Sequence, residues 1–181
     1  MQKQVWNDYE DRFRNRKQNW ERNERWLKQQ NQLRRLRYQQ SYWRRLENDR
    51  RRLQNARYYN SLVYNYRYSR NNRYYYTSSY GASMLRRALN DGYDQGYRAG
   101  QSDRYDGWGY DPYGNFGYSD ASYGYDSYYV SYSEYQYYFR EGFRRGYEDG
   151  YYGRYNYGAY NSGRYNLLSG ILGGLLLISL F

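Results

Sequence analysis

The sequence predicts a mainly α-helical protein with long irregular segments rich in tyrosine and glycine. Three observations support this fold class. Residues 2–57 contain neither glycine nor proline and are dominated by arginine, glutamine and other polar residues. Two later segments place glycine at every fourth position, and residues 167–181 carry no charge. We therefore expect a basic N-terminal helix or helices, a pair of glycine-grooved helices and a C-terminal hydrophobic helix.

Composition favours a protein that makes contacts over one that catalyses a reaction. The chain of 181 residues contains 33 tyrosines but no cysteine and no histidine. Tyrosine combines an apolar ring with a hydroxyl group, whereas the two absent residues carry most nucleophilic, metal-binding and acid–base chemistry near neutral pH. No phosphate loop, dinucleotide fingerprint or nucleophile elbow is present. The sequence predicts no enzyme activity, no catalytic or metal-binding residue and no cofactor.

Charge and glycine both change near residue 80. Residues 1–80 hold 20 Lys and Arg against 7 Asp and Glu, whereas residues 81–181 hold 9 against 11, and all 18 glycines begin at Gly81. We predict a basic helical arm at 1–57, an Arg/Tyr-rich linker or hairpin at 58–82, a Tyr/Gly-rich helix-pair domain at 83–165 and a hydrophobic segment at 166–181. The first ten residues show no apolar leader region, which indicates a cytoplasmic protein if Met1 is the true start.

The basic arm contains two apolar stripes with helical spacing, which consist of Trp6, Phe13, Trp20 and Leu27 and of Leu36, Trp43, Leu46 and Leu53. The stripes are out of phase, and the polar run 29–32 lies between them. The pattern is consistent with one long helix that contains a phase slip, or with two helices joined at this run.

Arginine and tyrosine interleave over residues 57–76. Tyrosine at 64, 66 and 68 alternates with other residues, and Asn71-Asn72 can reverse the chain, so the segment is either a hairpin or a disordered linker. Arginine can contact phosphate while tyrosine stacks on bases. The predicted contacts with nucleic acid or another polyanion are Arg57, Tyr66, Arg67, Tyr68, Arg70 and Arg73.

The four-residue glycine spacing predicts two closely packed helices, over 83–102 and 135–153. The helix-packing residues are Gly92, Gly96, Gly100, Gly142, Gly146 and Gly150, with the aromatic residues Tyr93, Tyr97, Phe139, Phe143, Tyr147 and Tyr151 beside them. Each glycine costs a helix about 0.5–1 kcal/mol relative to alanine, so a close neighbour must compensate. That neighbour is the other copy within the chain or in a second chain, unless no regular helix forms. The intervening segment, about thirty residues long, either wraps this pair or remains mobile.

Five aspartates, namely Asp103, Asp106, Asp111, Asp120 and Asp126, lie in or beside the intervening segment. Their spacing does not match a calcium-binding loop with alternating ligands and a final glutamate. We interpret them as residues that stabilise turns.

The C-terminal segment 167–181 is apolar on nearly every face. As one helix it would span about 22 Å, which is shorter than the roughly 30 Å hydrocarbon core of a membrane. It therefore enters a membrane shallowly, docks on the protein's own aromatic surface or packs on another chain. The predicted anchoring or assembly residues are Leu167, Leu168, Ile171, Leu172, Leu175, Leu176, Ile178 and Phe181.

The segments ALNDGYDQGYRAGQSDRYDG (88–107) and YYFREGFRRGYEDGYYGRY (137–155) resemble a group of uncharacterised tyrosine- and glycine-rich acidobacterial proteins that usually carry a secretory leader. The resemblance covers about residues 85–160 and leaves out the basic first half. The group has no assigned activity, so the resemblance implies no site residues. It implies a location in the cell envelope or extracellular space, with a removed leader.

These observations favour a non-enzymatic, self-associating structural or interaction protein of the cell envelope or extracellular space. Its expected partners are other copies of the chain, a membrane at residues 167–181, and a polyanion (nucleic acid, acidic glycan or lipid headgroup) at residues 1–80. The alternative is an Arg/Tyr-rich protein that binds single-stranded RNA or DNA.

Overall fold

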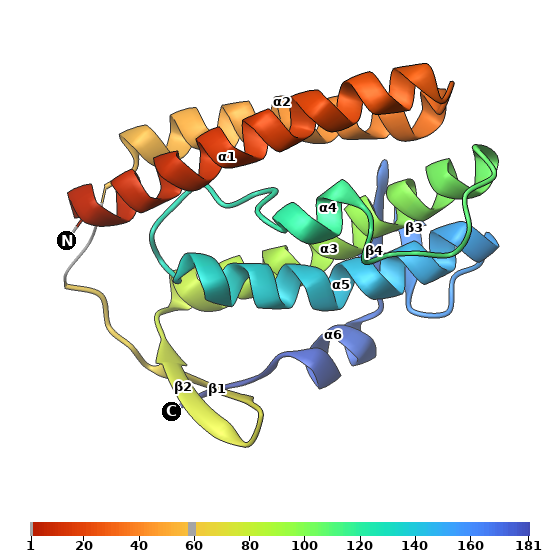
Figure 1. The fold of residues 1–181 in the computed structure, drawn as a ribbon. Helices are drawn as coiled ribbons and strands as arrows, with labels where there is room; N and C mark the ends of the chain where they lie inside the picture. Colours follow the sequence, from red (N-terminus) through yellow and green to blue (C-terminus); the bar gives the residue numbers. More distant parts are fainter. Residues whose placement is uncertain (1, 58–60) are drawn as a thin grey trace.

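The computed structural model describes residues 2–57 and 61–181, and helices predominate in it, so the predicted fold class is confirmed (Figure 1). Helices α1 (Gln2–Gln29) and α2 (Leu33–Asn55) form a hairpin that makes one layer. The layer beneath it contains α3 (Ser79–Tyr105), the short α4 (Phe116–Asp120) and α5 (Tyr132–Tyr152). The first residues of the expected 58–82 linker, 58–60, lie outside the described residues.

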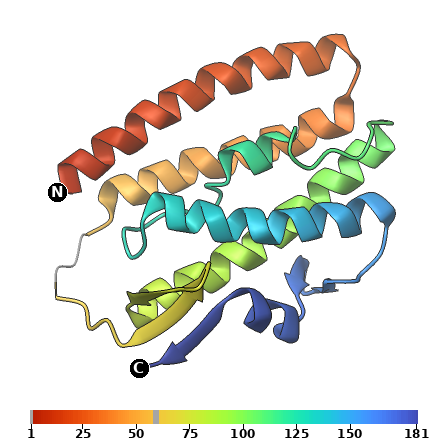
Figure 2. The same cartoon turned by 60° about the horizontal axis from the view of Figure 1, so that its bottom comes forward.

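The first β-hairpin and the chain from residue 169 onward lie on the side of the helix pair opposite to α1 and α2, whereas a second hairpin packs along α3 (Figure 2). Strands β1 (Tyr66–Arg70), β2 (Arg73–Thr77) and β5 (Leu177–Leu180) form an antiparallel sheet in the order β2-β1-β5. The second hairpin contains β3 (Gly158–Asn161) and β4 (Arg164–Leu167), and the short helix α6 (Ser169–Leu175) follows it. The two ends of the C-terminal segment are thus held by different sheets.

The basic arm is two helices joined at residues 30–32. Asn31 has a left-handed backbone (φ 56°), which turns the chain between α1 and α2. The two apolar stripes face each other, because the ring centre of Trp43 lies 5.0 Å from that of Phe13 and 5.3 Å from that of Trp20. The joint therefore brings the two out-of-phase stripes onto one shared interface.

Helices α3 and α5 run in the same direction, which explains the length of the segment that connects them (Figure 1). At 1.5 Å per residue, the 27 residues of α3 extend about 40 Å, and the chain must cover this length again before α5 begins. Residues 106–131 make this return, with α4 inside them. The connection therefore wraps the helix pair.

Tyrosines supply half of the twelve largest fully buried side chains, and buried carboxylates accept hydrogen bonds from several tyrosine hydroxyl groups. The hydroxyl of Tyr42 donates to Asp120 over 2.8 Å. Between α3 and α5, Tyr93 donates to Asp149 over 2.8 Å, and Tyr147 donates to Asp103 over 2.7 Å. These bonds satisfy polar groups that would otherwise be costly to bury. One continuous core results, which extends from α1 to the residue after α6.

Both β-hairpins turn over two residues with left-handed backbones. Asn71 (φ 51°) and Asn72 (φ 58°) connect β1 to β2, as the Asn-Asn pair indicated. Ser162 (φ 52°) and Gly163 (φ 80°) connect β3 to β4 in the same way. The first hairpin was one of two alternatives in the sequence, whereas the second was not predicted.

Candidate functional site

The six packing glycines lie on the interface between α3 and α5. A Cβ atom at Gly92 or Gly96 would overlap the carbonyl oxygen of Phe139 or Phe143 on α5. A Cβ atom at Gly142 would likewise overlap the carbonyl oxygen of Leu89 on α3. The contacts are reciprocal, because each glycine lies against the carbonyl group of the residue that is three positions before the facing glycine on the other helix. The backbones lie too close together for a Cβ atom at these positions, and this close packing compensates for the unfavourable helix propensity of glycine.

The aromatic residues beside the glycines are buried and form a continuous row along α5. Consecutive ring centres from Phe139 through Phe143 and Tyr147 to Tyr151 are 6.1, 6.2 and 6.0 Å apart. On α3, Tyr93 is fully buried and Tyr97 nearly so. Burial is also the largest cause of the raised pKa of the Tyr93 and Tyr147 hydroxyls, and their carboxylate partners raise it further. These residues build the core and offer no open binding site.

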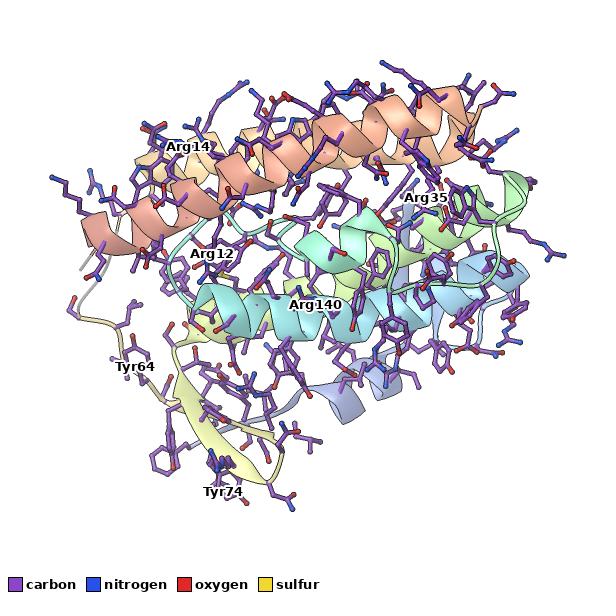
Figure 3. The ribbon with its side chains drawn as sticks, viewed as in Figure 1. Arg12, Arg14, Arg35, Tyr64, Tyr74 and Arg140 are labelled. Carbon is purple, nitrogen blue, oxygen red and sulfur yellow. The ribbon has the colours of Figure 1, made fainter. Side chains whose placement is uncertain are left out.

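The hairpin residues predicted to contact a polyanion do not form one free surface. Tyr68 is buried and donates to Glu134 over 2.9 Å, and Arg70 pairs with the same carboxylate at 3.1 Å. The guanidinium of Arg67 lies 4.6 Å from the ring centre of Tyr74. Tyr66 is half-buried in β1 and pairs with Thr77 and Leu180 across the sheet, while Arg57 and Arg73 are exposed. Figure 3 shows Tyr64 and Tyr74 at this end of the molecule, away from the helical layers.

All five aspartates bind protein groups, and Asp111 lies at a turn as interpreted, whereas Asp103 lies inside α3 and Asp120 is the last residue of α4. Asp106 accepts backbone hydrogen bonds at the start of α2, and Asp111 accepts one from Gly114. Asp120 and Asp126 pair with arginines, and Asp103 accepts from Tyr147. Within residues 2–57 and 61–181, no group of three or more acidic side chains is placed to hold a metal ion.

The prediction of a single C-terminal helix over residues 167–181 is wrong. Only Ser169–Leu175 are helical, and Leu177–Leu180 form the strand β5 against β1. The three glycines at 170, 173 and 174 are exposed with open space around them, so they pack against no helix among the described residues. The adjacent pair Gly173-Gly174 weakens the helix near its end, and hydrogen bonds to the open edge of β1 replace those that further helix would have made.

The eight predicted anchoring residues are divided between the protein's own core and its surface. Leu167 and Leu176 are buried. Four others, Ile171, Leu172, Leu175 and Ile178, are half-buried and pack against the core. Leu168 is 45% exposed and Phe181 is 73% exposed. The segment therefore docks on its own protein with one side and presents the other side to the surroundings.

Two further apolar residues of the segment, which the sequence did not single out, are among its most exposed. Leu177 is 59% exposed and Leu180 is 69% exposed, both on β5. Because β5 is the last strand of its sheet, its outer backbone edge pairs with no other strand of the described chain. Strand alternation, with Ile178 half-buried between exposed neighbours, could have identified Leu177, but it places Leu180 on the same face as Ile178. We refer to Leu177, Leu180, Phe181 and the outer edge of β5 as the tail edge.

None of the helices formed by residues 2–57 and 61–181 combines the length and the apolar character that a membrane crossing requires. The longest helices, α1 and α3, are rich in charged and polar residues.

The carboxyl group of Asp49 predicts a specific pH dependence of stability. Asp49 on α2 is fully buried, accepts from Arg45 over 2.7 Å and from the backbone of Gly124 over 2.8 Å, and burial raises its pKa to about 6. The folded state thus keeps this proton at pH values where the unfolded chain, with a pKa of about 3.9, has lost it. Its contribution to stability is complete below about pH 4 and is lost as the pH rises through 6.

Between pH 4 and pH 7, we expect the free energy of unfolding of the wild type to fall by up to about 3 kcal/mol relative to that of Asp49→Asn. The pKa of Asp49 differs by about 2 between the folded and unfolded states, and each pKa unit is worth about 1.4 kcal/mol. Urea denaturation of both proteins across this range measures the difference. Asparagine does not titrate and serves as the reference. Parallel stability curves for the two proteins would show that Asp49 is ionised in the folded state throughout.

Comparison of the chain with protein-family models, with curated proteins and with solved structures gives no match.

Proposed function

We propose that this protein is a non-enzymatic, self-associating structural or interaction protein, and that two copies join through the tail edge. The observation that supports this proposal most strongly is the combination of an unpaired strand edge with exposed leucine and phenylalanine side chains on one short segment. An exposed apolar strand edge is a template for pairing with another strand. Its burial in an assembly would remove an aggregation hazard.

A second copy of the chain suits the tail edge because the segment is uncharged. Residues 1–80 carry a net charge of +13, so most of the first half of the chain would repel its own copy, whereas residues 167–181 carry no side-chain charge. Two identical strands can pair antiparallel about a two-fold axis, which buries the same residues from both copies. The resemblance of residues 85–160 to uncharacterised proteins that usually carry a secretory leader supports a location in the cell envelope or extracellular space.

The test replaces Leu177 and Leu180 with lysine in the full-length chain. Both side chains are exposed, so the monomer should keep its thermal midpoint, while charge on the strand edge opposes pairing. We expect the dimer dissociation constant to increase at least about 100-fold, because each buried leucine is worth about 1.5–3 kcal/mol. Sedimentation velocity over a range of concentrations measures this change.

Val63→Lys is the matched control, since Val63 is 73% exposed and lies outside the tail edge. It should leave association unchanged. A wild-type chain that remains monomeric at high micromolar concentration would refute self-association. Flotation with lipid vesicles, added as a second arm, detects the alternative partner: wild-type flotation that the double lysine variant loses, without dimerisation in solution, would assign the tail edge to a membrane.

A further inference from the structure

A cleft of about 640 Å³ lies between α2 and α3, and no residue of the tail edge lines it. Residues of the 106–131 connection and of β4 also line it. A cleft of this volume is large enough to hold a small organic molecule. Its charged lining is the reason for considering it as a site.

Arginine dominates the lining of the cleft, and the six contributing residues are Arg34, Arg37, Arg45, Arg87, Arg98 and Arg164. They come from three separate segments of the chain, so their guanidinium groups approach the same space from different walls. The only acidic residues of the lining are Asp91 and Asp94. The excess of positive charge in a concave site attracts anions more strongly than the same charge on a flat surface.

Most of these arginines are held in place by internal contacts. Arg98 pairs with Asp94 at 3.1 Å, and Arg164 pairs with Asp91. Arg45 pairs with Asp49 at 2.7 Å and lies over the ring of Tyr123. Because an arginine presents five donors in a fixed fork, an ion pair on one edge leaves other N–H groups available. The internal pairs thus orient the guanidinium groups before any ligand arrives.

The two remaining arginines of α2 make no ion pair within the described chain. Arg34 and Arg37 are exposed at the rim, one helical turn apart, and the guanidinium of Arg34 lies 4.8 Å from the ring centre of Tyr105. A bound anion would give both of them a partner. They are therefore the residues whose removal should weaken a ligand while leaving the fold intact.

The geometry points to a binding site for a small, multiply charged anion of the phosphate class, such as a polyphosphate or a nucleoside phosphate. Planar guanidinium groups that converge from several walls match the tetrahedral, multidentate phosphate group. A cleft bounded by two helices, a loop and a strand favours a compact ligand, whereas a nucleic-acid backbone needs a continuous basic track. Anion binding in the cleft does not depend on self-association through the tail edge.

The test measures binding of inorganic tripolyphosphate to the full-length chain by isothermal titration calorimetry at low ionic strength. We expect one tripolyphosphate per chain, and an affinity that falls about tenfold or more in the double variant Arg34→Gln/Arg37→Gln. The matched control is Arg44→Gln/Arg86→Gln, which removes the same charge from one exposed position of α2 and one of α3, both outside the lining of the cleft. The control should change the affinity less than about twofold, since exposed charges at a distance are screened by salt.

Each result decides for or against the cleft. Absence of saturable binding to the wild type, or an equal loss in both double variants, would overturn the proposal, because the second result assigns binding to net charge alone. ATP, titrated in parallel, distinguishes the two sources of phosphate. Tighter binding of ATP than of tripolyphosphate supports a nucleoside phosphate that also contacts the tyrosines. Equal or weaker binding of ATP supports an inorganic polyphosphate.

Discussion

Replacing Gly96 with alanine is expected to destabilise the protein by about 3 kcal/mol, the upper range for overpacking a well-packed interior. The new Cβ atom would overlap the carbonyl oxygen of Phe143 and lie 2.8 Å from the backbone nitrogen of Tyr147. Both are backbone atoms of α5, so no side-chain rotation can relieve the overlap. The helices must move apart, and the buried rings beside the interface lose contacts. Gly96→Leu should abolish cooperative unfolding altogether.

Gly173→Ala is the control for the substitution itself. Gly173 is also helical, but nothing lies within 4 Å of the position where its Cβ atom would stand. This variant should be neutral or more stable by up to about 1 kcal/mol, because alanine favours helix and restricts the unfolded chain. Urea denaturation measures both variants. Similar, small effects of the two substitutions would mean that α3 and α5 do not meet through their glycines.

Replacing Arg16 with alanine should cost about 3–5 kcal/mol, the usual effect of removing one partner of a buried ion pair. One nitrogen of Arg16 lies 2.5 Å from Asp120 and donates to the hydroxyl of Tyr132 over 2.7 Å. Asp120 is almost completely buried. Without the guanidinium, this carboxylate must stay buried with less compensation or become protonated. The contact connects α1 to the second layer, so its loss should release the N-terminal helix first.

Arg14→Ala removes the same charge from the outer surface of α1, where Figure 3 shows Arg14 pointing away from the protein. Its effect should stay within about 0.5 kcal/mol, as for surface positions without specific partners. Hydrogen exchange of α1 distinguishes release of this helix from general destabilisation. If both arginine variants leave α1 equally protected, the basic arm is held by its aromatic contacts alone.

The sequence predicted local structure well where a particular residue type is needed for a particular backbone geometry. Glycine spacing identified the packing faces of α3 and α5, because only glycine permits such close approach. The Asn71-Asn72 pair indicated a turn, because asparagine tolerates a left-handed backbone. The direction of the helix pair was not predictable in this way, since a glycine face is compatible with a parallel or an antiparallel partner.

The sequence did not predict features that depend on contacts between distant residues, because no local motif marks them. Arg67 and Arg70, predicted to contact phosphate, also lie against the Tyr74 ring of β2 and Glu134 of α5, and the sequence did not indicate these internal contacts. The cleft combines arginines from α2, α3 and β4, which share no local motif. The tail ends as a strand because β1 offers an open edge, and that edge is not apparent from the apolar residues alone.

The parallel direction of α3 and α5 also sets the order of events when the chain folds. Contacting positions such as Gly92 and Phe139 are 47 residues apart in the sequence, so the interface cannot form before a long loop has closed. The α1–α2 hairpin needs no such closure and can form early, whereas the helix pair makes the chain fold more slowly than an ordinary helical bundle. During this delay the glycine faces are open, and each can pair with the matching face of another chain instead. Rapid refolding at high concentration is therefore expected to produce exchanged dimers in which α3 of one chain lies against α5 of the other.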